Sequence, residues 1–174
     1  MTSQSARILS IDIGISAAAP CTFAVLAYTD RYHYIRSGSL DPANLELFAA
    51  LLQTERYDIV AIERGFLVPG SRAGADVLQN IEYSAMLYAT ALNEQRTRNL
   101  SYNLHWLSQP QWSRYLCGTR RSANSREIAY VVRHSVLDLP TRSNVHLRDA
   151  IGLGIAAHLL SRPLGKIKQE EIGR

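Results

Sequence analysis

The sequence predicts one α/β domain in which a mixed β-sheet is flanked by helices. Three apolar segments, at residues 8–12, 21–28 and 32–39, are separated only by short turns, which indicates an antiparallel meander. A helical segment then precedes a fourth apolar strand at residues 57–63, and a crossover of this kind favours parallel pairing. With 174 residues, the chain is long enough to bury a full core as one domain over residues 1–174.

Helices are expected to fill most of the remaining chain and to leave room for one more strand. Asp41 is the expected N-cap of the first helix, because aspartate accepts hydrogen bonds at helix starts and Pro42 suits the first turn. Helical periodicity predicts a long helix over residues 75–96. The later expected elements are a fifth strand over residues 100–107, a short helix over 109–117, a helix over 126–137 capped by Ser125, and a closing helix over 147–160.

Composition and charge indicate a globular protein with a basic surface. The hydrophobic share is 47% and the charged share is 20%, with a net charge of +4 and a pI near 9.3, which suits a polyanionic partner. Cys21 and Cys117 lack metal-ligand spacing and are expected to be small core residues in a reducing compartment. No apolar run approaches the roughly 18 residues of a membrane helix, and no signal peptide is recognisable, so we expect a cytoplasmic protein with no membrane partner. The charged tail over residues 161–174 is expected to be mobile.

Acidic residues mark the ends of two predicted strands. Asp12 interrupts an otherwise apolar strand, and a buried carboxylate there is costly unless a cation compensates it. Glu63 ends the fourth strand. His146 and Asp149 lie three residues apart at the start of the closing helix, hence on one face. Together these residues predict a site for magnesium or manganese, with two ions that activate water and stabilise the leaving oxygen of a phosphodiester.

Each of these four residues also has an ordinary structural explanation when it is taken alone. Asp12 could be a turn aspartate, although Ile11 and Ile13 continue the apolar run around it. Glu63 could be an exposed carboxylate at a strand end, and Asp149 an acid favoured by the helix dipole. His146 could be a surface or capping histidine. The prediction therefore depends on the joint pattern.

Two further features indicate a nucleic-acid partner. Arginines dominate the segment before the closing helix, and arginine pairs bidentately with phosphate, although a solvated basic loop would also explain them. Phe66, three residues after Glu63 in a glycine-rich loop, could stack on an unpaired base or could anchor the loop in the core. The arginines of this segment are Arg114, Arg120, Arg121, Arg126, Arg133, Arg142 and Arg148.

The order of elements resembles the ribonuclease H-like fold, with a five-stranded mixed sheet. In that fold an aspartate lies on the first strand, an acid ends the fourth, and the last helix supplies the remaining ligands. The motifs more specifically resemble the RuvC family of Holliday-junction resolvases, over about residues 8–158. The matching segments are Ile11-Asp12-Ile13-Gly14, Ile62-Glu63-Arg64-Gly65-Phe66, residues 118–128, and His146-Leu147-Arg148-Asp149-Ala150 with the Gly152-Leu153-Gly154 that follows.

The resemblance implies a metal-dependent endonuclease that resolves four-way DNA junctions by paired symmetrical nicks. It implies that Asp12, Glu63, His146 and Asp149 are catalytic metal ligands for two Mg²⁺ or Mn²⁺ ions, and that Phe66 probes the junction centre. Many members carry aspartate in place of His146. The family's usual lysines are absent, so the DNA-binding role would pass to arginines, which cannot give up a proton. The candidates for that role are Arg114, Arg120, Arg121 and Arg126.

The resemblance also implies a homodimer, with the helix over residues 75–96 as the dimer helix. Its residues Ala85, Ala89 and Leu92 suit close packing against a partner, or equally burial within one chain. Two alternative functions remain open. One is a ribonuclease H-like nuclease that acts on RNA or an RNA–DNA hybrid, as RuvX-type enzymes do. The other is a junction-binding protein without catalysis.

Overall fold

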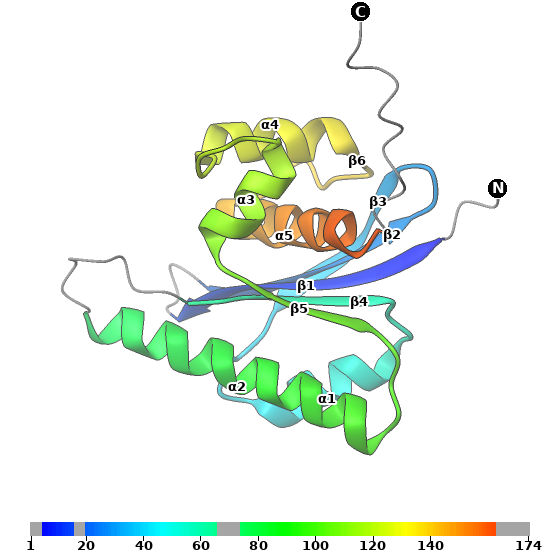
Figure 1. Ribbon diagram of the computed structural model, residues 1–174, viewed down its shortest axis with the longest axis vertical. Coiled ribbons are helices and arrows are strands. Elements are labelled where there is room, and N and C mark those ends of the chain that lie inside the picture. The colour runs from blue at the N-terminus through cyan, green and yellow to red at the C-terminus, as the bar shows by residue number, and fades with distance from the viewer. Residues whose placement is uncertain (1–4, 16–19, 66–73, 163–174) are drawn as a thin grey trace, which may run out of the picture.

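The computed structural model describes residues 5–15, 20–65 and 74–162, which form one sheet with helices on both faces (Figure 1). The prediction of a mobile tail falls largely outside these residues. In the described chain, no helix is long and apolar enough to cross a membrane. The elements are β1 (Ala6–Ile15), β2 (Pro20–Tyr28), β3 (Tyr32–Ser39), α1 (Leu45–Thr54), β4 (Ile59–Glu63), α2 (Ala75–Thr97), β5 (Asn103–Leu107), α3 (Gln109–Cys117), α4 (Ser125–Ser135), β6 (Val136–Leu137) and α5 (Val145–Ser161).

The sheet has the strand order β5-β4-β1-β2-β3-β6 and mixed directions. β1, β2 and β3 form the predicted antiparallel meander. β4 pairs parallel to an existing strand after the α1 crossover, as predicted, and that strand is β1. The expected count of five strands is wrong by one, because Val136 and Leu137 form a short sixth strand parallel to β3. The sequence prediction had placed both residues in the preceding helix. Val136 instead adopts an extended backbone and buries its side chain in the core.

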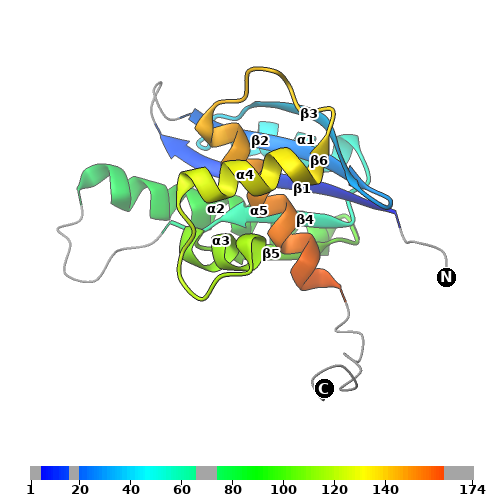
Figure 2. The same ribbon diagram turned by 90° about the horizontal axis from the view of Figure 1, so that it is seen from above.

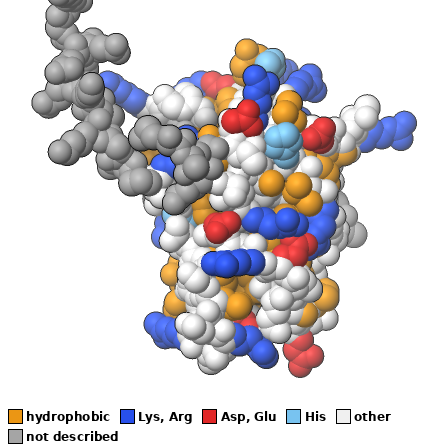
Figure 3. All heavy atoms as spheres, turned by 90° about the vertical axis from the view of Figure 1, so that its right-hand side faces the viewer, with side chains coloured by type: hydrophobic (Ala, Val, Ile, Leu, Met, Phe, Trp, Pro, Cys, Tyr) orange, Lys and Arg blue, Asp and Glu red, His pale blue; other side chains and the backbone are white. Residues whose placement is uncertain are grey.

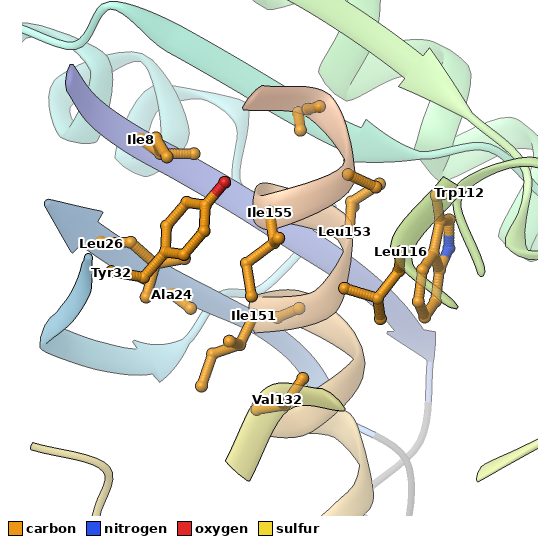
Figure 4. Close-up of a cluster of buried hydrophobic side chains, with 14 of the residues drawn as sticks. Ile8, Ala24, Leu26, Tyr32, Trp112, Leu116, Val132, Ile151, Leu153 and Ile155 are labelled. Carbon is orange, nitrogen blue, oxygen red and sulfur yellow. The ribbon is translucent and has the colours of Figure 1, made fainter. Parts of the chain in front are cut away.

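Side chains that alternate across the sheet build two separate cores. Ile8 of β1 packs beneath α3, α4 and α5, whereas Leu9 and Ile11 pack against α1 and α2 on the other face. In Figure 4, Ile151, Leu153 and Ile155 of α5 lie between strand side chains, such as Leu26 and Tyr32, and Leu116 and Trp112 of α3. The same alternation directs Asp12 to the α5 side.

α5 lies very close to β1, and glycine makes this approach possible. A Cβ atom at Gly154 would lie 2.8 Å from Ser10 Oγ and 3.2 Å from Ser10 Cβ. Ser10 is fully buried, so it has little room to move away. The spacing of α5 above β1, and therefore the position of the residues at its start, depends on this glycine.

Alanine at this position (Gly154→Ala) is expected to destabilise the protein by about 1–3 kcal/mol, because the new methyl group overpacks the α5–β1 contact. Thermal unfolding followed by circular dichroism measures this effect. An unchanged melting temperature would show that α5 and β1 move apart without loss of stability, which would contradict close packing between Gly154 and Ser10.

Two expected helix caps are wrong, because asparagines take their place. α1 begins at Leu45 with Asn44 as its N-cap, while Asp41 instead accepts a hydrogen bond from the backbone N–H of Ala43. α4 begins with Asn124 as its cap, and Ser125 is the first helical residue. Four other expected elements agree with the structure within three residues: α2, α3, α5 and β5.

Candidate active site

The parallel pairing of β1 with β4 brings Asp12 and Glu63 together. Ile11 lies opposite Ile62 in this ladder, so the next residue of each strand falls at the same level. Asp12 is only 6% exposed, and its side-chain carboxyl contacts that of Glu63. Two carboxyl groups in contact require a shared proton or a cation between them.

The start of α5 supplies the other two predicted residues. Asn144 caps the helix by accepting a hydrogen bond from the backbone N–H of Leu147. His146 then places its Nδ1 atom 2.9 Å from Asp12 Oδ2. Asp149 lies close enough that its charge interacts with those of Glu63 and His146. The structure thus brings all four predicted residues to the edge of the sheet where β1 and β4 end.

Burial and mutual repulsion raise the pKa values of all three acids. Burial raises the pKa of Asp12 to about 6, and the charge of Asp149 adds to this rise while hydrogen bonding to Glu63 opposes it. Burial raises the pKa of Asp149 to about 6 as well, and the charge of Glu63 contributes. The pKa of Glu63 is raised well above its usual value by burial and by its contact with Asp12. Without a cation, the Asp12–Glu63 pair is therefore favoured in a form that keeps a proton.

Trp112 is a neighbour of the site that sequence reasoning missed. Its indole Nε1–H donates a hydrogen bond of 3.3 Å to Glu63 Oε1, and the backbone N–H of Ile13 also bonds this carboxyl. Trp112 is 1% exposed and belongs to the core cluster in Figure 4. From the sequence, a tryptophan on an amphipathic helix is interpreted as a core residue. No sequence pattern therefore predicts the contact between Trp112 and Glu63.

The donor set fits a hard divalent cation. Three carboxylates supply oxygen ligands, which magnesium and manganese prefer, and an imidazole is compatible with manganese. Burial, followed by the charges of neighbouring acids, raises the pKa values of Asp12 and Asp149, and a bound cation would favour their charged forms. As the side chains stand, no group of three or more His, Cys, Asp and Glu in the described residues is arranged to hold an ion. Asp12 is bonded instead to His146 and Glu63, so the carboxyls would have to turn toward a bound cation.

The predicted DNA-binding arginines lie on and between α3 and α4. Arg114, Arg120 and Arg126 are exposed, and Arg114 Nε donates to the carbonyl of Pro110. Arg121 is also exposed, but both of its terminal nitrogens bond Glu127, at 3.1 and 2.6 Å. Arg121 is therefore the least available of the four for phosphate.

Two other predictions concern residues near the site. Phe66 lies outside the described residues, so neither base stacking nor burial is tested for it. Cys21 is buried as expected, whereas Cys117 is only partly so, and both thiols are free.

Comparison with solved structures identifies the fold. Thermus thermophilus RuvC in complex with a Holliday junction substrate matches with a TM-score of 0.66 and 16% identity, over 90% of this chain and 95% of that one. The chain has a RuvC-like fold. A second structure of Thermus thermophilus RuvC matches with a TM-score of 0.62 and 16% identity, over the same shares of the two chains. The yeast mitochondrial Holliday junction resolvase Ydc2 matches with a TM-score of 0.57 and 14% identity, over 88% of this chain and 77% of that one.

The RuvC-like fold confirms the predicted ribonuclease H-like architecture. No protein-family model and no curated protein matches the sequence. The similarity of this chain to solved structures is therefore detectable, whereas its sequence similarity to family models and curated proteins is not. At 14–16% identity, the shared feature is the fold, and the roles of individual residues in this chain rest on their own geometry.

Proposed function

We propose that this protein is a metal-dependent endonuclease that resolves four-way DNA junctions by paired symmetrical nicks. The observation that carries the proposal is the convergence of Asp12, Glu63, His146 and Asp149 at one edge of a RuvC-like sheet. The match to a RuvC structure solved with a Holliday junction substrate supports four-way DNA as the substrate.

Asp12, Glu63 and Asp149 would hold the Mg²⁺ or Mn²⁺ ions, and His146 would be a ligand or would position the attacking water. When bound, two such ions activate water and stabilise the leaving oxygen of the phosphodiester. The chain's own contribution is to fix the carboxyls on β1, β4 and α5, in a site that is largely shielded from solvent. Trp112 and the backbone of Ile13 hold one side of Glu63 and leave the rest of its carboxyl for the site.

DNA contacts would surround this cluster. Phe66 follows Glu63 by three residues and would contact the unpaired centre of the junction. The exposed arginines of α3 and α4 would bind backbone phosphates and position the DNA without reading its sequence. These arginines are Arg114, Arg120 and Arg126, with Arg121 available once it leaves Glu127.

A homodimer through α2 would supply two active sites for two opposed strands. Ala85 and Ala89 are exposed on α2, so they are not buried within one chain, and small residues allow another helix to approach closely. Leu78 on the same helix is 53% exposed. Figure 2 shows the N-terminal part of α2 projecting beyond the sheet, where a partner helix could pack.

The proposal is tested with a panel of labelled substrates in Mn²⁺: a synthetic four-way junction, a linear duplex of the same sequence, and an RNA–DNA hybrid. Paired nicks at symmetrical positions in the junction alone are the expected result. Cleavage of the hybrid instead would favour an RNA-processing nuclease. Junction binding without cleavage in any metal would indicate a non-catalytic binding protein.

Removing the indole N–H of Trp112 while keeping an aromatic ring (Trp112→Phe) is expected to weaken catalysis. Glu63 would lose one of the donors that orient it, and such supporting contacts typically contribute about 10–100-fold to metal affinity or activity. The Mn²⁺ concentration that gives half-maximal cleavage should rise. The melting temperature should also fall, because Trp112 is fully buried and the smaller ring leaves a cavity, so the metal dependence is the informative measurement.

Trp106→Phe is the matched control, because the indole N–H of Trp106 is buried without a partner in the described chain. Equal metal dependence in the two variants would contradict an orienting role for Trp112.

A further inference from the structure

A cavity of about 300 Å³ lies between α4, α5 and the segment that joins β6 to α5. Figure 2 shows α4 crossing over α5 and this segment arcing back to the start of α5. Two arginines line the cavity, Arg133 from α4 and Arg148 from α5. Thr141 and Ser143 from the connecting segment also line it. The cavity belongs to none of the catalytic positions proposed above.

Both arginines are available to a ligand. In the described chain neither guanidinium forms an ion pair with a carboxylate, whereas Arg121 is paired with Glu127. Arg148 Nε donates to the carbonyl of Asn144 at 3.2 Å, which fixes the direction of its head group, and among the described residues its terminal nitrogens form no ion pair. Two positive charges that share one cavity repel each other unless an anion lies between them.

The lining is selective for an anion with several acceptor oxygens. A guanidinium offers a planar fork of N–H donors, and two hydroxyl groups add further donors. Val132 and Leu139 provide an apolar wall, and none of the described residues that line the cavity is acidic. A phosphate group matches this arrangement better than a carboxylate or a neutral ligand, because it presents oxygens in several directions.

The position of the cavity suggests where that phosphate comes from. Arg148 immediately precedes Asp149 in α5, so the cavity and the acid cluster share the start of one helix. Its volume is at the low end of the roughly 300–1,000 Å³ of small-ligand pockets, so it admits one group and not a whole duplex. Figure 3 shows one face of the molecule, on which basic and acidic side chains lie next to one another.

We propose that this cavity binds one backbone phosphate of the DNA strand that is held in the candidate active site. The proposal rests on the proposed function, and it adds Arg133, Arg148, Thr141 and Ser143 to the residues that contact DNA. The bound phosphate fixes the register of the strand relative to Asp149.

The test compares Arg133→Gln with wild type in binding to a fluorescent four-way junction without divalent metal, over a series of salt concentrations. Arg133 is exposed and lies on a different helix from the acids, so the fold and the acid cluster should remain intact. Because each neutralised phosphate contributes about 0.9 to the slope of log K against log salt, the slope should become shallower by about 0.9. Arg133→Lys, which keeps the charge, should keep the wild-type slope.

Arg31→Gln is the matched control, since Arg31 is an exposed arginine in the turn between β2 and β3. Its slope should equal that of wild type. An unchanged slope in Arg133→Gln would overturn the inference while leaving the proposed function intact. Failure of the wild-type protein to bind junctions would instead contradict the proposed function itself.

A second experiment uses inorganic phosphate, because a free phosphate ion presents the same acceptor oxygens as a backbone phosphate. Phosphate should raise the melting temperature of wild type only weakly, and the effect should be lost in Arg133→Gln. If Arg133→Gln abolished a strong phosphate response but left the DNA slope unchanged, the cavity would be a site for free phosphate, and the assignment to DNA would be wrong.

Discussion

Replacing Asp12 with asparagine (Asp12→Asn) is expected to lower junction cleavage by at least about 1,000-fold while leaving junction binding nearly unchanged. Asparagine has the same shape and keeps a hydrogen-bonding oxygen for His146, but it carries no charge for a cation. Asp12 lies at the centre of the site, in contact with both Glu63 and His146. Loss of the Asp12 charge should therefore abolish cleavage and leave the arrangement of the neighbouring side chains unchanged.

Single-turnover cleavage in Mn²⁺ measures the rate, and fluorescence anisotropy in EDTA measures binding. Asp58→Asn is a useful comparison, because Asp58 precedes β4 at its other end and accepts a hydrogen bond from the backbone of Arg7. That variant should keep its cleavage rate. A cleavage rate for Asp12→Asn within about tenfold of wild type would show that Asp12 is not a metal ligand.

The same substitution is expected to stabilise the metal-free protein at neutral pH. The pKa of Asp12 is about 6 in the folded protein and its ordinary value is 3.8, so folding favours the protonated carboxyl. The stability that the protonated form contributes is complete below about pH 4 and is lost as the pH rises through about 6. A difference of about two pKa units corresponds to roughly 3 kcal/mol.

Comparison with wild type at each pH removes the contributions of titrating groups that do not interact with Asp12. Burial lowers the pKa of His158 to about 4, so this residue affects stability in the opposite direction over much of the same range. Because both proteins contain His158, its contribution cancels in the difference. In EDTA, the stability advantage of Asp12→Asn should grow by roughly 3 kcal/mol between pH 4 and 7.5.

Urea unfolding in EDTA at pH 4 and pH 7.5 measures this advantage. Added Mn²⁺ should then stabilise wild type at pH 7.5 and have little effect on the variant, because ligand binding stabilises only the form that binds it. A constant difference between the proteins at all pH values would mean that Asp12 is already charged and compensated in the folded state.

The sequence predicts that Asp12 lies on a buried strand, because the apolar run continues on both sides of it. The parallel direction of β4 also follows from the intervening helix, whereas the choice of β1 as its partner does not. The register that sets Asp12 level with Glu63 does not follow, because it depends on side-chain packing across both cores. Proximity of the two carboxyls could be proposed from the sequence but not shown.

Competition between two locally acceptable structures explains the errors at the ends of the helices. Asp41 and Asn44 are both good caps, and only the folded chain shows that Asp41 closes a turn while Asn44 caps α1. Val136 continues the helical pattern of α4, yet pairing with β3 makes it a strand residue. In both places a tertiary contact decides between two locally acceptable structures.

Contacts between distant segments explain what the sequence could not provide at the site. Trp112 and Glu63 are 49 residues apart, and nothing in either segment indicates that an indole will bond the carboxyl. The cavity between Arg133 and Arg148 likewise depends on how α4 crosses α5. Arginine counts alone indicated a nucleic-acid partner but could not separate Arg121, which pairs with Glu127, from its neighbours.

A supercoiled plasmid with an extruded cruciform tests the central claim most directly. Treatment with the wild-type protein in Mn²⁺ should give linear DNA whose ends map to opposed positions at the base of the cruciform, because two coordinated nicks open both strands. A plasmid without the cruciform should remain supercoiled. Intact cruciform plasmid, or random nicking of both plasmids, would contradict a site built for symmetrical cleavage of four-way junctions.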